Sequence, residues 1–464
     1  MSTAHRNHTR VIGLLAILAL LVAVLAMTVS AAEADKEVRV EMTIGQTAYT
    51  VNGTEKTMDS APYVNSDDRT MVPLRFLGEA IGAEVSWDAA ADTAVIVYEN
   101  QTIKFKLFEN TMQVDDQIIT IDTQSTIQNG RTMVPLRAAA EAIGSTVFYN
   151  KGVVTFVHAE TVTVSNFQQL QQAVAAGVEN IKVENFDASG ETTTKVVIER
   201  PLVLDGNGAK IDFGFEVLSN GVTIKNFEIT TSEFDKAVSA PGNNGGPGDC
   251  IVVEIHNDNT GKPVVVTGLT IRHDIFGNKN SAIYLADGSY VEIKNNNITV
   301  ENKEKNSYER GGIFVGAGVS GEISGNTIDA ALTGFPMSPI GLATTLDKLT
   351  EDVKVAPVVI KDNKVSSIYV TKMYASGTLF GEDGSILKDD KDFGVREALS
   401  KFLVDLEKNN TFTLKDGYPV ENEAGYVQCR LDKIMAGAPY YEKNVFFNVT
   451  DGKLAAVPAP AEEK

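Results

Sequence analysis

The sequence predicts a mainly β protein, in which a small α+β domain with an internal duplication is followed by a solenoid of β-strands. Two repeats support this fold class. A seven-residue motif occurs twice within the first 140 residues, 62 residues apart. A different, eight-residue template then recurs five times between residues 222 and 365, in a stretch rich in Gly and Asn that has no long helical pattern. Each repeat defines one part of the chain.

Length, charge and cysteine content exclude several classes of protein and site. A chain of 464 residues suggests roughly two to four domains, and 43% hydrophobic with 22% charged residues is a globular composition. The net charge of 41 − 61 = −20 disfavours a polyanion partner, and no nucleic-acid-binding face is visible in the sequence. Two cysteines, Cys250 and Cys429, are too few for a disulfide scaffold, a zinc cage or an iron–sulfur site. A bond between them and two free thiols both remain open.

The N-terminus has the layout of a secretory signal peptide. Two arginines precede an apolar run, Val11–Met27, and small residues follow it. We expect cleavage near Ala31 or Ala32, so that residues 1–32 are removed; an uncleaved N-terminal anchor is the alternative. No second apolar span follows in the sequence. We therefore expect a secreted protein associated with the cell surface, without a membrane span after cleavage, and with a net charge of 39 − 61 = −22.

The first domain is marked by the duplicated motif. Arg69-Thr-Met-Val-Pro-Leu-Arg75 recurs as Arg131-Thr-Met-Val-Pro-Leu-Arg137, and both copies continue into Glu-Ala-Ile-Gly. Each copy predicts a strand, then a short helix that begins just after the proline and stops at the glycine, then another strand. We expect Arg75 and Arg137 to form ion pairs that tie each helix to a neighbouring strand.

This stretch, residues 38–160, resembles the copper amine oxidase N-terminal-like (stalk) domain, present as two repeats of about 62 residues. The resemblance implies a non-catalytic attachment or spacer module. In oxidases that share the stalk, copper belongs to a separate catalytic domain. Copper is not expected here, because His158 is the region's only histidine.

The second repeat predicts the rest of the fold. Its template has apolar residues at places 1, 3 and 8, with Asn, Gly or Asp at the bend between. Its copies begin at Val222, Val264, Val291, Gly321 and Val358. Spacings of 27 to 42 residues suit solenoid coils joined by loops of variable length.

This pattern resembles the right-handed parallel β-helix of the pectate-lyase-like superfamily, over residues 161–375. The resemblance implies an N-terminal helical cap at residues 161–180. It also implies an interior ladder of amides, formed by Asn296, Asn326 and Asn363. Residues 376–450 are expected to form a C-terminal cap region, and residues 451–464 a disordered tail.

A candidate site follows from the alternation of side chains along the strands. Arg272, Asp274, Glu301 and Asp329 are expected to point outward, with the carboxylates of Asp274 and Glu301 on adjacent strands. Polysaccharide lyases of this superfamily combine an acidic calcium cluster with a basic residue. Arg272 and Asp274 are thus the candidate catalytic residues, and Asp274, Glu301 and Asp329 the candidate calcium ligands. The alternative is the ordinary charged face of an acidic solenoid.

The preferred hypothesis is a non-enzymatic secreted or cell-surface protein without a cofactor. Its stalk domain would present a β-helix that binds a cell-wall or extracellular glycan, or a surface protein. The competing hypothesis is an extracellular polysaccharide lyase or hydrolase, for which calcium is possible.

Overall fold

The computed structural model describes thirteen segments of the chain: residues 37–187, 195–230, 250–274, 280–301, 311–330, 339–345, 357–367, 371–376, 405–406, 408–414, 426–433, 441–450 and 453–457. The signal peptide predicted for residues 1–32 lies outside these residues. Within them, no helix combines the length and apolar character that crossing a membrane requires. The chain divides into two compact units, with the boundary between Val162 and Thr163.

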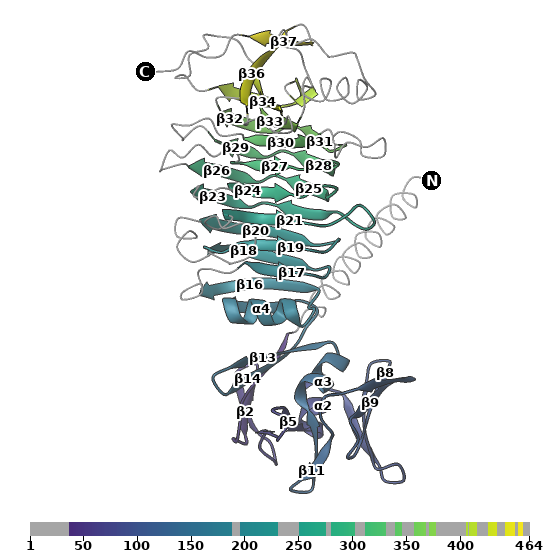
Figure 1. Cartoon of the computed structure of the whole chain (residues 1–464). Coiled ribbons are helices and arrows are strands. Elements are labelled where there is room, and N and C mark those ends of the chain that lie inside the picture. Colours follow the sequence, from purple (N-terminus) through teal and green to yellow (C-terminus); the bar gives the residue numbers. More distant parts are fainter. Residues whose placement is uncertain are drawn as a thin grey trace, which may run out of the picture. The chain divides into compact units, whose positions relative to one another are not determined.

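Residues 37–162 form three antiparallel sheets and two short helices, α2 (Leu74–Ile81) and α3 (Leu136–Ala142) (Figure 1). The strand orders are β13-β14-β1-β2-β3, β10-β9-β8-β7-β6 and β11-β12-β5-β4. The strands are β1 (Val38–Thr43), β2 (Ala48–Val51), β3 (Thr54–Thr57), β4 (Tyr63–Val64), β5 (Thr70–Pro73), β6 (Glu84–Asp88), β7 (Thr93–Tyr98), β8 (Gln101–Lys106), β9 (Thr111–Val114), β10 (Gln117–Thr120), β11 (Thr126–Gln128), β12 (Arg131–Pro135), β13 (Ser145–Asn150) and β14 (Val153–His158).

The two sequence repeats exchange strands. The first repeat contributes β1 to β7 with α2, and the second contributes β8 to β14 with α3. The last two strands of each repeat pair with the first three strands of the other, since β14 pairs with β1 and β7 pairs with β8. Neither repeat therefore completes its own sheets, and the two are interlocked halves of one domain.

The two motif strands meet at a local two-fold axis. Strand β5 pairs with β12 in antiparallel register, with Val72 opposite Val134. These two residues are equivalent positions of the repeat. Buried side chains of both halves form one core cluster, which includes Leu77, Ile96 and Leu136. The sequence repeat is thus expressed as a symmetric fold with a shared core.

The helices of this domain largely follow the sequence prediction. Pro73 is the N-cap of α2, and Gly82 ends it in the left-handed conformation with φ 76°. The prediction for the arginines was wrong: Arg75 and Arg137 are exposed, and neither forms an ion pair with a described residue. Arg137 instead lies over the ring of Tyr149, 5.3 Å from its centroid.

The second unit is a parallel solenoid, which confirms the predicted fold class. Its coils stack mainly parallel strands into two long sheets (Figure 1). One sheet contains β15 (Val162–Asn166), β16 (Asn180–Asp187), β18 (Val203–Ile211), β20 (Thr223–Thr230), β22 (Val264–Thr267), β23 (Thr270–Asp274), β25 (Tyr290–Lys294), β26 (Asn297–Glu301), β28 (Ser320–Ser324), β29 (Thr327–Asp329), β31 (Val359–Lys361), β32 (Lys364–Ser367) and β34 (Thr411–Leu414). The other contains β17 (Val196–Ile198), β19 (Phe215–Val217), β21 (Cys250–Ile255), β24 (Asn280–Leu285), β27 (Ile313–Val315), β30 (Ile340–Thr345), β33 (Thr371–Ser376), β35 (Tyr426–Lys433), β36 (Tyr441–Thr450) and β37 (Lys453–Val457).

The eight-residue template forms the bend in the first of these sheets. Its fifth place has a positive φ in all five copies, at Asn226, Gly268, Asn295, Gly325 and Asp362. Asn, Gly and Asp tolerate this left-handed conformation better than other residues. The template therefore encodes one sharp turn per coil, with the apolar places on either side buried.

The sixth place of the template forms the predicted interior ladder. The side-chain amide of Asn296 donates to Oδ1 of Asn326 at 2.9 Å, and that of Asn326 donates to Oδ1 of Asn363 at 2.9 Å. Asn410 extends the ladder by one more amide, since it accepts from Asn363 at 2.8 Å. All three predicted asparagines are at least 98% buried, with exposed fractions of 2%, 0% and 0%.

The ends of the solenoid differ in part from the prediction. Helix α4 (Phe167–Ala175) lies at the N-terminal end, where Phe167 packs edge-on against Phe213 at 4.7 Å. At the other end, β37 pairs with β36 in an antiparallel hairpin, so the segment predicted as a tail from residue 451 contains a strand. Asp-Gly at residues 451–452 is a strong hairpin signal, which the sequence prediction overlooked.

Candidate functional site

The residues predicted for the lyase hypothesis lie on three neighbouring strands of the solenoid. Arg272 and Asp274 are on β23, Glu301 is on β26 and Asp329 is on β29. Asp274 is in register with Glu301, as the template alignment predicts. Arg272 and Asp329 both align with Thr299, on either side of it.

The patch combines exposed and partly buried side chains. Arg272 is exposed and Asp329 is partly buried. The side chains of Asp274 and Glu301 lie outside the described residues. His273, which lies between Arg272 and Asp274 on β23, is 1% exposed and points inward, as the alternation of side chains along a strand requires. The backbone thus brings the four predicted positions together on adjacent coils.

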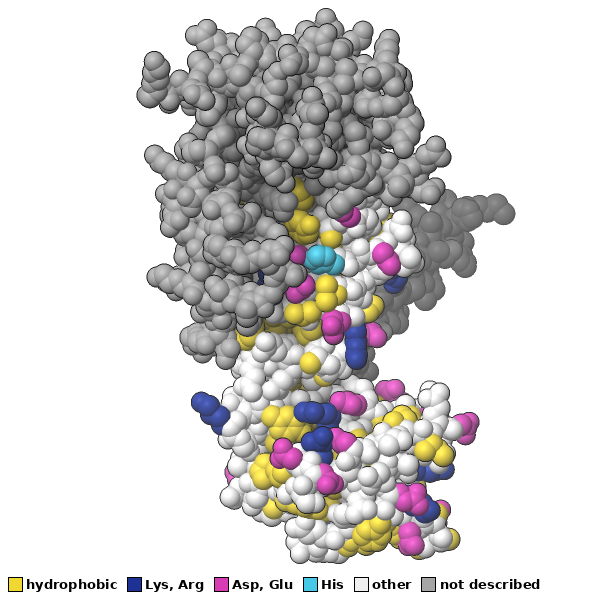
Figure 2. All heavy atoms as spheres, in the orientation of Figure 1, with side chains coloured by type: hydrophobic (Ala, Val, Ile, Leu, Met, Phe, Trp, Pro, Cys, Tyr) yellow, Lys and Arg dark blue, Asp and Glu magenta, His cyan; other side chains and the backbone are white. Residues whose placement is uncertain are grey.

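A second cluster lies on the other sheet and was missed in the sequence. Glu216 on β19 is in register with Glu254 on β21, and His256 follows directly after that strand. One ligand atom from each of these three side chains lies within 4.8 Å of the others. Figure 2 shows acidic, basic and histidine side chains next to hydrophobic ones on the described face of the solenoid. The template did not reveal the cluster, because it aligns only strands of the first sheet.

Ion pairing already satisfies the central carboxylate of this cluster. Glu254 forms an ion pair with Lys195, and it also accepts from Nε2 of His256 at 2.8 Å. Burial raises the pKa of Glu254, but the charge and hydrogen bond of Lys195 and the hydrogen bond of His256 outweigh it. The pKa of Glu254 therefore lies below its ordinary value. This carboxyl is suited to stay ionised and to hold its neighbours, and it is poorly suited to act as a general acid.

An aromatic pair continues the same column on the next two coils. Tyr284 is in register with Glu254 and Phe314 with Tyr284. Their rings are stacked, with centroids 5.3 Å apart and planes 5° apart. Phe314 is only 3% exposed and Tyr284 is partly buried, so the pair does not offer an open platform.

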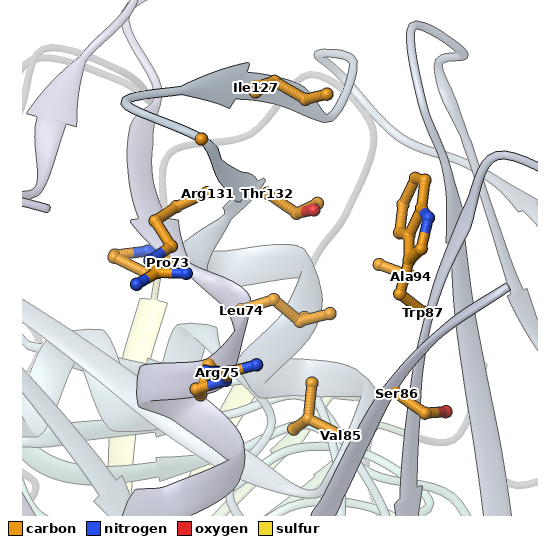
Figure 3. A pocket seen from close by; sticks show the side chains of 11 residues that line it. Pro73, Leu74, Arg75, Val85, Ser86, Trp87, Ala94, Ile127, Arg131 and Thr132 are labelled. Carbon is orange, nitrogen blue, oxygen red and sulfur yellow. The ribbon is translucent and has the colours of Figure 1, made fainter. Parts of the chain in front are cut away.

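The N-terminal domain contains a cavity of about 370 Å³ between α2, β6 and the hairpin of β11 and β12 (Figure 3). The lining residues are Pro73, Leu74, Arg75, Val85, Ser86, Trp87, Ala94, Ile127, Gly130, Arg131 and Thr132. Trp87 stands on one wall, and Arg75, Leu74 and Thr132 lie across the opening from it. The sequence repeat contains these residues, but the side-chain packing that opens the cavity has no sequence signal.

Polar groups surround the apolar floor of the cavity. The exposed fraction of Trp87 is 44%, so the indole faces solvent. Arg131 forms an ion pair with Asp59, whereas Arg75 forms none with a described residue. A cavity with a flat aromatic wall, the hydroxyl of Thr132 and the guanidinium of Arg75 is equipped to bind a polar ligand with a planar face and a negative charge.

The N-terminal domain contains one histidine among its described residues, His158. Within the described segments, the grouping of three potential ligands is Glu216, Glu254 and His256, on the solenoid. His158 is engaged by the hydroxyls of Tyr98 and Ser145, each at 2.8 Å. A single histidine held in this way does not provide the ligand set that copper prefers.

Comparison with known proteins identifies only the N-terminal part. No curated protein and no solved structure matches the chain. One family model does match, over residues 50–157, and a single match spans both copies of the motif. The repeats therefore do not form two domains: residues 50–157 are one copper amine oxidase N-terminal domain.

Proposed function

We propose that this is a non-enzymatic, exported cell-surface protein whose N-terminal domain attaches it to the surface and whose solenoid binds a glycan or a neighbouring protein. The observation that carries the proposal is the way in which the solenoid uses its outward carboxylates. Several of them bind lysines on a neighbouring coil, which stabilises the stack.

Three described carboxylates illustrate this use. Asp205 pairs with Lys225 on the next coil at 3.1 Å. Glu322 lies between two lysines on the coils before and after it, Lys294 at 3.6 Å and Lys361 at 3.3 Å. Glu254 pairs with Lys195, as described above.

The pKa of each of these three carboxyls lies below its ordinary value. Burial raises the pKa of Asp205 and of Glu254, but hydrogen bonds and the charges of nearby lysines lower it by more. For Glu322, the hydrogen bond from Ser324 is the largest cause, and Lys294 and Lys361 act in the same direction. General acid catalysis requires a carboxyl with a raised pKa. These three groups favour a structural role.

The lyase hypothesis is a second candidate because one observation favours it. Asp274 and Glu301 are in backbone register on adjacent coils, and Arg272 is two residues before Asp274 on the same strand. A calcium ion between two such carboxylates with a basic residue beside it is a geometry that could neutralise a uronate.

Incubation with polysaccharides separates the two functions. The mature protein would be mixed with pectate, alginate or glycosaminoglycans, with and without calcium, and the unsaturated uronate product followed by ultraviolet absorbance. We expect no product. Calcium-dependent product that is lost in Arg272→Ala, but kept in the control Lys210→Ala on an exposed part of the solenoid, would establish the lyase instead.

Fractionation of the producing cells tests the attachment. We expect the processed chain in the cell-wall fraction, released by treatments that remove wall polysaccharide. Recovery of all of the protein from the culture medium would contradict the attachment role of the N-terminal domain.

A further inference from the structure

The two halves of the N-terminal domain are equivalent in sequence, but only one of them is open. Adding 62 to each number relates Trp87 to Tyr149 and Arg75 to Arg137, and Thr70 corresponds to Thr132 in the same way. Trp87 and Thr132 are each more exposed than their counterparts. The cavity is therefore a departure from the domain's own symmetry.

In the closed half, the ring of Tyr149 occupies the space that corresponds to the cavity. Arg137 lies over the ring of Tyr149 at 5.3 Å, a cation–π contact. The Tyr149 hydroxyl hydrogen-bonds the side chain of Thr70. Burial raises the pKa of Tyr149, and the hydrogen bond to Thr70 and the charge of Arg137 oppose this rise. One ring thus satisfies both the arginine and the threonine.

In the open half, the corresponding ring stands apart from its arginine. Trp87 is on the opposite wall from Arg75 and Thr132 (Figure 3), and the cavity of about 370 Å³ lies between them. Arg75 forms no ion pair with any described residue. The arginine and threonine that hold an internal ring in one half are therefore available to an external ring in the other.

We propose that this cavity binds a uronate residue of an anionic polysaccharide. The pyranose ring stacks its C–H face on Trp87, the carboxylate accepts paired hydrogen bonds from Arg75, and a ring hydroxyl bonds Thr132. The volume is in the range of small-ligand sites, at the lower end of about 300–1,000 Å³. The proposal rests on the attachment role proposed above and names its ligand.

The polar groups of the cavity favour a sugar over an aromatic peptide side chain. An aromatic peptide side chain could stack on Trp87 or lie under Arg75, as Tyr149 lies under Arg137, but it carries no carboxylate to accept the paired hydrogen bonds of the guanidinium. A uronate carries a carboxylate and several hydroxyls around one compact ring. Its chemistry therefore complements Trp87, Arg75 and Thr132.

Trp87 is the only tryptophan of the chain, so its fluorescence reports on this cavity. The mature full-length protein would be titrated with trigalacturonate, with cellotriose as the neutral control and with a tyrosine-containing tripeptide. We expect a saturable blue shift with trigalacturonate, at least about tenfold weaker binding of cellotriose, and no response to the peptide. Absence of any change with trigalacturonate, or a stronger response to the peptide, would overturn the proposal.

Two matched arginine variants test the role assigned to the open half. Arg75→Ala is expected to weaken trigalacturonate binding by about tenfold or more, because it removes a charge-assisted contact. Arg137→Ala, the equivalent change in the closed half, is expected to leave the affinity unchanged while lowering the melting temperature. Equal affinities of Arg75→Ala and the wild type would refute the cavity as the site. If Arg75→Ala also stayed on the cell wall, the attachment role would stand and only the cavity would be wrong.

Discussion

Substitution of one interior asparagine provides a quantitative test of the solenoid. The side chain of Asn326 is fully buried and makes four hydrogen bonds. Its Oδ1 accepts from the backbone nitrogen and the side-chain amide of Asn296, at 3.0 and 2.9 Å. Its Nδ2 donates to the carbonyl of Ile293 at 2.8 Å and to Oδ1 of Asn363 at 2.9 Å. The amide therefore uses its full hydrogen-bonding capacity.

The change Asn326→Leu removes all four bonds. Two donors on Asn296 and the Ile293 carbonyl lose a partner in the dry interior, whereas Oδ1 of Asn363 keeps the backbone N–H of residue 326. Three buried groups at about 1–3 kcal/mol each give a range of roughly 3–9 kcal/mol, from which the burial of the leucine side chain subtracts a part. From the middle of this range, less about 1.5–3 kcal/mol for the leucine side chain, we expect a loss of about 3–4.5 kcal/mol, a large share of an ordinary stability of about 5–15 kcal/mol.

Thermal unfolding measures this loss. At roughly 2–4 °C per kcal/mol for a unit of this size, the solenoid transition should fall by at least about 6 °C. The matched control is Asn297→Leu, one residue after Asn296, where the side chain is exposed. We expect the control to change stability by no more than about 0.5 kcal/mol. Equal shifts for the two variants would refute the assignment of Asn326 to an interior ladder.

Three further outcomes are expected. Because the halves exchange strands, residues 37–99 alone should give no folded signal by circular dichroism, whereas residues 37–162 should fold; a folded half would contradict the interlocked topology. Burial lowers the pKa of His158 below 6.5, so the unfolded state binds the extra proton at a higher pH than the folded state does. The stability of the N-terminal domain, measured by urea unfolding, should therefore fall as the pH drops from about 7.5 to 5.5. This pH dependence should be smaller in His158→Gln. Gly321→Ala should destabilise the solenoid far more than Gly288→Ala. A Cβ at residue 321 would lie 1.9 Å from the carbonyl oxygen of Val291, whereas a Cβ at residue 288 would have no atom within 4 Å. Similar shifts in melting temperature for the two variants would contradict this packing.

The template made the solenoid predictable because its chemistry is local. A left-handed backbone at place 5 favours Asn, Gly or Asp, as at Asn295 and Gly325. An inward amide at place 6 must find partners, which are the same places on neighbouring coils, as for Asn326. Regular alternation also placed Asp274 beside Glu301. These features depend on the backbone geometry of a single coil.

Features that depend on packing between distant residues could not be predicted. The repeat marks Val72 and Val134 as equivalent, but the sequence does not say that the halves exchange strands. Trp87 and Tyr149 occupy equivalent places, yet only the second packs under its arginine. The pairing of Glu216 with Glu254 bridges 38 residues outside the template. In each case the sequence supplies the side chains and the tertiary fold decides their contacts.

Co-sedimentation with isolated bacterial cell walls tests the proposed attachment most directly. The purified mature protein would be mixed with intact walls and with walls from which the anionic polysaccharide has been extracted, and the fraction in each pellet measured. We expect the protein to pellet with intact walls and to stay in solution with extracted ones. Protein that stays in solution with intact walls, or that pellets equally with both, would contradict attachment through an anionic glycan.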